Sequence, residues 1–267
     1  MKKWNKLLAL LLALVMALGL AACGNGADDS STAPSDEGTN SGAPVSEEPQ
    51  GTKTFVFGSD ANANTFDPAT DLQTNSARAL TNSVLETLWK VNNDGTVVDD
   101  LAASHEWTGD LELTVVLNEG ITFHDGEPFN AEAVIANWER GRSDQSLRIY
   151  TQTQSWVSAV ADSEYQLTIT LDEPNNTFIN KLTQVRIISP KAIEEWGQDG
   201  LAKQSAGTGP YILSERVDGG YTKMVRNENY WREGPKVDTL TFKVVPEDGA
   251  RIAMLQTGEA DVINPVP

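Results

Sequence analysis

The chain has a single cysteine, Cys23, which stands at the end of an apolar run near the N-terminus. One cysteine cannot form a disulfide within the chain, so other interactions must stabilise the fold. The run covers the 14 residues 7–20 and comes after three lysines. A positive start, an apolar stretch and small residues before the cleavage point are the layout of a secretory signal. The alternative, a transmembrane helix, needs about 20 apolar residues and is disfavoured. We therefore expect residues 1–22 to be a signal peptide.

The segment Leu20-Ala21-Ala22-Cys23 resembles the lipobox of bacterial lipoproteins, in which the cysteine takes a diacylglycerol. Lipidation would leave no thiol for a disulfide or for thiol catalysis. The chain would then depend on its apolar core, and 267 residues can bury a substantial one. The resemblance implies an extracytoplasmic protein held on the membrane by a lipid anchor at Cys23.

Charge and composition narrow the range of partners. The formal net charge of −18 argues against nucleic acid, because that binding depends on phosphate neutralisation by Lys and Arg. The two histidines, His105 and His124, are 19 residues apart with no cysteine nearby, so a structural zinc site is not expected. His124 and Glu127 are a possible metal pair, but their polar turn favours a solvated loop. We expect no cofactor.

Residues 24–52 contain no aromatic residue and carry six acidic side chains before the first base, Lys53. Such a segment cannot bury enough apolar surface to offset its ordering entropy. We expect residues 23–52 to be a disordered acidic tether that begins with the lipidated Cys23. A small folded cap is the alternative, and it would have little to fold around.

Order is expected from Lys53 onward. Apolar and β-branched runs predict strands at 54–57, 111–117, 165–171, 211–217, 221–225 and 239–245, with one opened by Trp156 and a hairpin over 89–98. Cap residues and near-helical spacing predict helices that begin at Thr74 (reaching Leu88), Asn130, Ser189 and Asp248. Strands and helices interleave without a regular period, so we predict a mixed α/β (α+β) class.

Four groups of residues, taken together, carry a resemblance to one family. They are 66–68 with 85–88 and 94–95; Gly120-Ile121-Thr122-Phe123-His124-Asp125-Gly126-Glu127-Pro128-Phe129-Asn130-Ala131-Glu132; Gly207-Thr208-Gly209-Pro210-Tyr211; and Arg226-Asn227-Glu228-Asn229-Tyr230-Trp231 with 255–261. Over residues 53–263 the set resembles the solute-binding lipoproteins of ABC importers, family 5, which carry peptides, nickel complexes and related solutes. The glycine-rich stretch alone fits any tight turn.

The resemblance implies a periplasmic-binding-protein-like type II fold that encloses its ligand between two lobes. The first lobe would comprise 53–82 plus 183–262, with an α+β subdomain inserted over 83–182. Residues 263–267 would start the crossover, and we expect the second lobe to be absent from this chain. The implied partners are a peptide or small-solute ligand and the permease subunits of an ABC transporter.

In the family, the segment after the Asp-Pro pair touches the ligand, and here it supplies Thr70, Asp71, Gln73 and Thr74. Thr70 and Gln73 offer hydrogen bonds to peptide groups, and Asp71 offers a partner for an amine or a cation. The alternative is a loop that approaches a helix with Asp71 in water.

Three more candidates lie further along the chain. Tyr150 falls where nickel- and peptide-binding members place an aromatic at the cleft mouth. Thr183 matches by spacing an arginine that holds a carboxylate in nickel-binding relatives, and Arg186 follows three residues later. An arginine fork pairs bidentately with a carboxylate, although a half-buried ion pair is the alternative for Arg186.

Several aromatic residues are interpreted as scaffold. Phe123, Phe129 and Trp138 are expected in the core with Val134. Tyr230 and Trp231 are expected to pack under the lobe, with ligand stacking as the alternative.

The leading hypothesis is the capture of an oligopeptide or a related solute for delivery to a permease, with no enzyme activity. A lipid-anchored extracellular hydrolase is the rival, and it needs a nucleophile with a base or two positioned carboxylates. The chain has no Gly-x-Ser-x-Gly elbow, His-Glu-x-x-His motif or phosphate-binding glycine loop. A surface lipoprotein without a transport role is a third possibility, and a hydrolysis assay would separate the enzyme from the other two.

Overall fold

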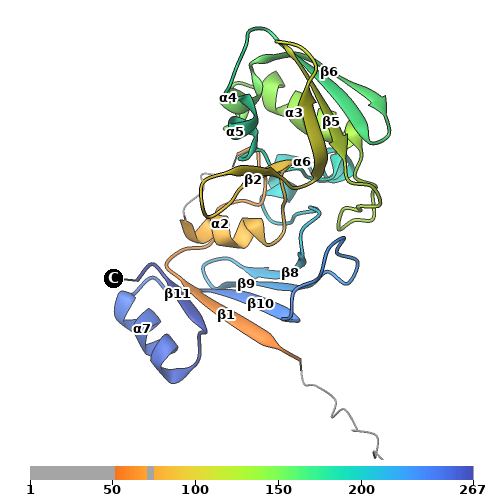
Figure 1. Ribbon diagram of the computed structural model, residues 1–267. Coiled ribbons are helices and arrows are strands. Elements are labelled where there is room, and N and C mark those ends of the chain that lie inside the picture. The colour runs from red at the N-terminus through yellow and green to blue at the C-terminus, as the bar shows by residue number, and fades with distance from the viewer. Residues whose placement is uncertain (1–51, 71–74, 267) are drawn as a thin grey trace, which may run out of the picture. The chain divides into compact units, whose positions relative to one another are not determined.

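The computed structural model describes residues 52–70 and 75–266 (Figure 1). The expected signal peptide, the lipidated Cys23 and almost all of the acidic tether lie outside these residues, as do Asp71, Gln73 and Thr74. Within the described ranges, no helix is both long and apolar enough to cross a bilayer.

Strands from the beginning and the end of the described chain form one five-stranded sheet. Their order is β11 (Val262–Asn264), β1 (Thr54–Ser59), β10 (Thr239–Val244), β9 (Tyr221–Arg226) and β8 (Tyr211–Val217). β1 runs parallel to both neighbours, with Phe57 opposite Phe242 on one side and Val262 on the other. The other pairs are antiparallel. The expected sheet between the first strand and the strands after Tyr211 is confirmed.

The middle of the chain forms a second, antiparallel sheet (Figure 1). Its order is β4 (Ala102–Trp107), β5 (Glu112–Leu117), β7 (Gln166–Leu171) and β6 (Trp156–Ser163). Helix α3 (Ala131–Ser143) packs against it, with the rings of Trp138 and Trp156 edge to face at 5.5 Å between centroids. The short helix α4 (Tyr150–Thr153) precedes β6, and the short helix α5 (Phe178–Leu182) follows β7. β4 was not predicted, because five of its six residues are exposed and no apolar alternation marks it.

The predicted hairpin is confirmed as β2 (Trp89–Val91) and β3 (Val97–Asp99). The helix before it, α2 (Asn75–Asn82), ends earlier than predicted. Val84 and Leu85 are buried but not helical, because the chain turns there to meet a distant loop. The amide of Gly209 donates to the Val84 carbonyl, and that of Tyr211 donates to the Ser83 carbonyl, both at 3.0 Å. Tertiary hydrogen bonds therefore replace the last helical turn.

The predicted caps of two helices are confirmed. Asn130 accepts a hydrogen bond from the Ala133 amide at the start of α3, and Ser189 accepts one from the Ala192 amide at the start of α6 (Pro190–Leu201). The predicted cap of α7 (Asp248–Thr257) is wrong, because Asp248 is already helical and its carboxylate accepts from Arg251.

Two large apolar clusters stabilise these sheets. One surrounds the antiparallel sheet and contains all four residues that the sequence assigned to the core: Phe123, Phe129, Val134 and Trp138. The other lies between α2 and the five-stranded sheet, where Leu80 packs with Met224 and Phe242. A smaller cluster around Met254 and Ile263 joins α7 to β11.

Candidate ligand pocket

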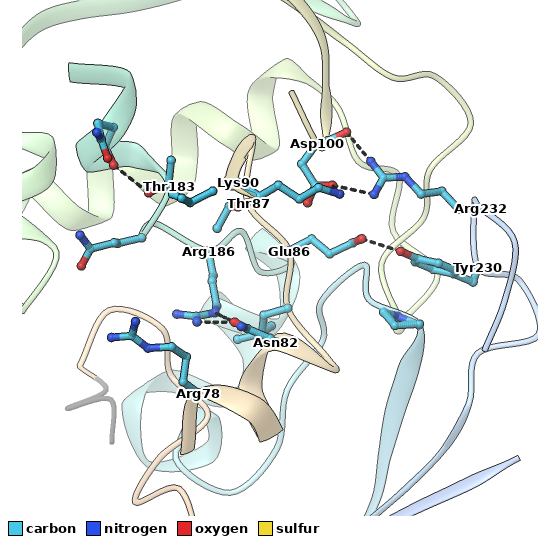
Figure 2. A pocket seen from close by; sticks show the side chains of 15 residues that line it. Arg78, Asn82, Glu86, Thr87, Lys90, Asp100, Thr183, Arg186, Tyr230 and Arg232 are labelled. Carbon is cyan, nitrogen blue, oxygen red and sulfur yellow. Dashed lines mark hydrogen bonds and ion pairs between the residues drawn. The ribbon is translucent and has the colours of Figure 1, made fainter. Parts of the chain in front are cut away.

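A pocket of about 750 Å³ is formed mainly by α2, the segment 85–91 and the segment after α5 (Figure 2). Residues from three further regions, at 100, at 210 and at 230–232, complete it. Its lining in the described part of the chain is Arg78, Asn82, Leu85, Glu86, Thr87, Lys90, Val91, Asp100, Asn180, Thr183, Gln184, Arg186, Pro210, Tyr230 and Arg232. Six of these side chains carry formal charge, so polar recognition dominates the chemistry that it offers.

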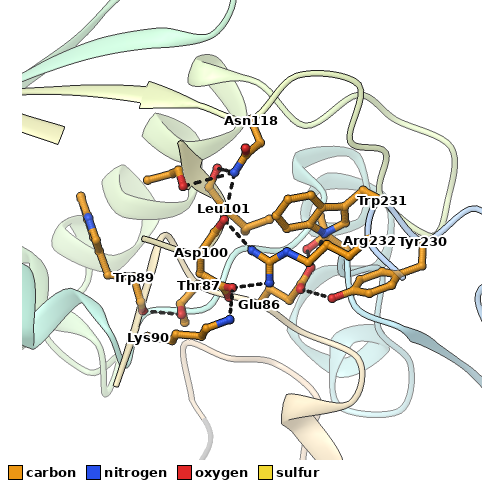
Figure 3. Close-up of polar contacts among 12 residues, drawn as sticks. Glu86, Thr87, Trp89, Lys90, Asp100, Leu101, Asn118, Tyr230, Trp231 and Arg232 are labelled. Atoms are coloured by element: carbon orange, nitrogen blue, oxygen red, sulfur yellow. Dashed lines mark hydrogen bonds and ion pairs between the residues drawn. The ribbon is translucent and has the colours of Figure 1, made fainter. Parts of the chain in front are cut away.

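Glu86 is a nearly buried carboxylate at the wall of this pocket. It accepts hydrogen bonds from the Tyr230 hydroxyl at 2.7 Å and the Trp231 indole N–H at 2.9 Å (Figure 3). The Thr208 hydroxyl donates a third, at 2.8 Å. Burial raises the pKa of Glu86 above its usual range, and the three hydrogen bonds oppose that rise. Tyr230 and Trp231, which the sequence suggested as packing residues, thus also hold the Glu86 carboxylate by hydrogen bonds. Tyr230 lines the pocket as well.

The second carboxylate, Asp100, is held between two bases. Lys90 Nζ lies 2.8 Å and Arg232 Nη1 lies 2.6 Å from Asp100 Oδ1, and Arg232 also donates to the Asp100 carbonyl (Figure 3). The Arg232 guanidinium stacks on the Trp231 ring at 3.9 Å from its centroid. The Asn118 amide donates to the carbonyls of residues 100, 101 and 102, which fixes the backbone beneath this group.

Arg186 enters the pocket from a segment that bridges to Thr87. Its Nε and Nη2 donate to Asn82 Oδ1 at 3.2 and 2.5 Å (Figure 2). Thr183 lines the same pocket, and its hydroxyl donates to the Asn180 carbonyl at 2.7 Å. The structure therefore brings together two of the ligand residues that the sequence proposed.

The other described candidates lie elsewhere. Thr70 donates from its amide and its hydroxyl to the Asp67 carbonyl, and it does not line this pocket. Tyr150 begins α4, is half-buried and does not line it either.

Sequence reasoning did not propose five of the charged lining residues: Arg78, Glu86, Lys90, Asp100 and Arg232. Two of them carried a readable signal. Glu86 is a lone acid among Leu85, Thr87 and Leu88, and Arg232 directly follows the aromatic pair. The remaining three, Arg78, Lys90 and Asp100, have no comparable signal in the residues beside them.

The loop of Gly207, Thr208 and Gly209 positions Glu86 from behind. A Cβ on Gly207 would lie 2.2 Å from the Val84 carbonyl oxygen, and one on Gly209 would lie 2.6 Å from the Val84 carbonyl carbon. The loop therefore packs directly on the backbone before Glu86, which only glycine permits. The Gly207-Thr208-Gly209 stretch therefore supports the wall of the pocket by packing behind Glu86.

His124 contacts the same loop, and its Nε2 donates to the Gly209 carbonyl at 2.9 Å. Burial lowers the pKa of His124, so the neutral ring is favoured. Across the described residues, no group of three or more His, Cys, Asp or Glu side chains is arranged to hold a metal ion.

Comparisons with known proteins agree with one another. The family model of bacterial extracellular solute-binding proteins, family 5 middle region, matches residues 96–267. The glutathione-binding protein of Salmonella typhi is 34% identical over 220 residues, which are 80% of this chain and 43% of that protein. The chain thus spans less than half the length of this relative.

Solved structures show the same likeness. The nickel ABC transporter structure from Bacillus halodurans has a TM-score of 0.69 and 28% identity, covering 80% of this chain and 43% of the other. A Helicobacter pylori periplasmic binding protein in complex with the peptide STSA has a TM-score of 0.70 and 24% identity, covering 78% and 45%, and shows the fold. The predicted type II periplasmic-binding-protein-like fold is confirmed, and the chain belongs to the family 5 bacterial extracellular solute-binding proteins.

Proposed function

We propose that this chain captures oligopeptides, or a related solute such as a nickel complex, for delivery to the permease of an ABC importer. The observation that carries the proposal is the pocket that contains both Thr183 and Arg186. Its volume of about 750 Å³ suits a small peptide, since ligand pockets span roughly 300–1,000 Å³. Relatives named for glutathione, nickel and peptide binding support the class of solute.

The pocket residues have distinct roles in this proposal. The Arg186 guanidinium, held by Asn82, places a positive charge at the pocket wall that attracts a ligand carboxylate. Thr183 supplies a hydroxyl to a peptide group. The ligand contacts assigned to Thr70, Asp71, Gln73, Thr74 and Tyr150 remain proposals, as does the division into a lobe of 53–82 plus 183–262 and an inserted subdomain of 83–182.

The family and the N-terminal residues support a proposal for where the protein acts. Members are extracellular solute-binding proteins. We propose that residues 1–22 are removed, that Cys23 carries a lipid anchor, and that residues 24–52 tether the binding domain to the membrane. The apolar run before the only cysteine supports this arrangement.

Binding can be tested on the full chain in detergent by ligand-observed saturation-transfer NMR. The solutes are glutathione and a pooled set of di- to pentapeptides, and nickel–histidine is titrated separately by calorimetry because the paramagnetic metal broadens proton signals. We expect dissociation constants weaker than micromolar, because half-exposed ion pairs contribute only about 0–1 kcal/mol each. Thr183→Val should weaken binding severalfold. Thr257→Val is the matched control, because Thr257 makes the same kind of hydroxyl bond to the carbonyl three residues before it and lies outside the pocket.

Two outcomes would count against this function. One is the lack of any binding signal from every solute at millimolar concentration. The other is cleavage of the peptides during the experiment, which would favour the hydrolase alternative.

A further inference from the structure

We propose that this pocket selects solutes of net negative charge, with two or more carboxylates, over neutral and cationic solutes. The inference rests on the proposed function and adds the charge class of the solute. Its starting point is a contrast: the chain carries a formal net charge of −18, yet the described lining of its pocket has four bases and two acids.

The two acids are already satisfied by the protein. Glu86 accepts hydrogen bonds from Thr208, Tyr230 and Trp231, all neutral donors. Asp100 is paired with both Lys90 and Arg232, and only 7% of its side chain is exposed. A ligand amine would therefore have to compete with existing donors before it could reach either carboxylate. Because breaking a buried network leaves groups unpaired, that exchange is unfavourable.

The bases keep capacity for a ligand. Arg78 is exposed, and no residue in the described ranges pairs with its guanidinium through a hydrogen bond or an ion pair. Lys90 has a 47% exposed side chain and three N–H donors, one of which meets Asp100. Within the described residues, an exposed guanidinium and a half-exposed ammonium that line one pocket attract anions and repel cations.

These bases stand on different elements. Arg78 projects from α2 and Lys90 from β2, with Arg186 between them in the view of Figure 2. A solute with one carboxylate satisfies one base at a time. A solute with two carboxylates can meet both sides of the pocket at once, which favours acidic peptides and dicarboxylates.

A matched peptide series tests the charge preference. Ala-Glu-Ala, Ala-Gln-Ala and Ala-Lys-Ala share a backbone and carry net charges of about −1, 0 and +1 at neutral pH. The full chain in detergent is titrated with each by saturation-transfer NMR, at low salt and with added sodium chloride. We expect Ala-Glu-Ala to bind at least about tenfold more tightly than Ala-Lys-Ala, and the preference to shrink as salt screens the charges.

Arg78→Gln and Lys90→Gln should each reduce the preference for Ala-Glu-Ala by about two- to fivefold, the range of a partly exposed ion pair. Lys203→Gln removes one positive charge outside the pocket and should leave the preference unchanged. Near-equal melting temperatures of the variants establish that the differences arise in the pocket.

The outcomes separate the two levels of the proposal. Equal binding of the three peptides, or a preference for Ala-Lys-Ala, overturns the charge inference and leaves the solute-binding function standing. No binding of any peptide overturns both. A preference that both pocket variants leave intact overturns the assignment to Arg78 and Lys90.

Discussion

Arg140 of α3 donates two hydrogen bonds to the carboxylate of Asp67, at 2.8 and 2.6 Å. Asp67 is fully buried and its Oδ1 also accepts from the Ala69 amide. It lies in the loop that leaves β1 of the five-stranded sheet, whereas α3 packs on the antiparallel sheet. This bidentate ion pair therefore links the loop after β1 of the five-stranded sheet to the helix that covers the antiparallel sheet.

Removing Arg140 should be strongly destabilising. Arg140→Ala leaves a buried carboxylate without its partner, which typically costs about 3–5 kcal/mol. Lys191→Ala breaks the exposed pair with Glu127, at 3.2 Å, and should cost far less stability because water screens both charges. Urea unfolding of the two variants measures the difference. Equal losses would show that the Asp67 pair contributes no more than a surface contact.

The close packing of Gly207 gives a second prediction. Gly207→Ala places a methyl group 2.2 Å from the Val84 carbonyl oxygen, so backbone must move and the loop that holds Glu86 is displaced. We expect a loss of about 2–4 kcal/mol, as for severe overpacking. Gly234→Ala is the control, because a Cβ there meets nothing within 4 Å. Thermal unfolding that is unchanged in Gly207→Ala would contradict the packing described.

The fold was largely predictable from local patterns, and the pocket was not. The alternation of Leu113, Val115 and Leu117 marks a half-buried strand, and Asn130 marks a helix start, whatever the rest of the chain does. The early end of α2 was missed because hydrogen bonds from Gly209 and Tyr211, more than a hundred residues away, decide it. Long-range contacts override local helical spacing there.

The pocket was missed for a similar reason. Lys90, Asp100 and Arg232 stand on three separate segments, and their grouping exists only once the hairpin and the loop after β9 meet. No spacing in the sequence encodes that meeting. Thr183 and Arg186 were proposed from the family resemblance, and both line the pocket.

His124 should make stability depend on pH below neutrality. Its folded pKa is lower than the ordinary value of 6.5 because burial disfavours the charged ring. As pH falls through 6.5, the unfolded chain binds a proton before the native chain does, so stability falls toward the folded pKa. His124→Gln can keep the bond to the Gly209 carbonyl and should flatten this slope. The test is melting temperature against pH from 7.5 to 5, and identical slopes would contradict it.

Cys23 gives a prediction about location. Cys23→Ser should move the protein from the membrane fraction into the soluble fraction, because the only thiol for lipid attachment is lost. Ser30→Ala, seven residues later in the same segment, should leave it in the membrane fraction. Fractionation and immunoblotting measure both. Retention of the Cys23→Ser protein would mean that the apolar run of 7–20 holds it as a helix.

The parallel position of β1 between β10 and β11 has a consequence for the order of folding. Lys53 and Asp238, which bond at the start of the β1–β10 pair, are 185 residues apart in the chain. Hairpin pairs such as β6–β7 close over short loops and form early, whereas distant pairs carry a large loop-closure cost. During synthesis, β1 is made before the other described strands and pairs late. While the antiparallel sheet assembles, β1, which contains Phe-Val-Phe, is still unpaired and exposed to solvent. Aggregation competes with folding during that time.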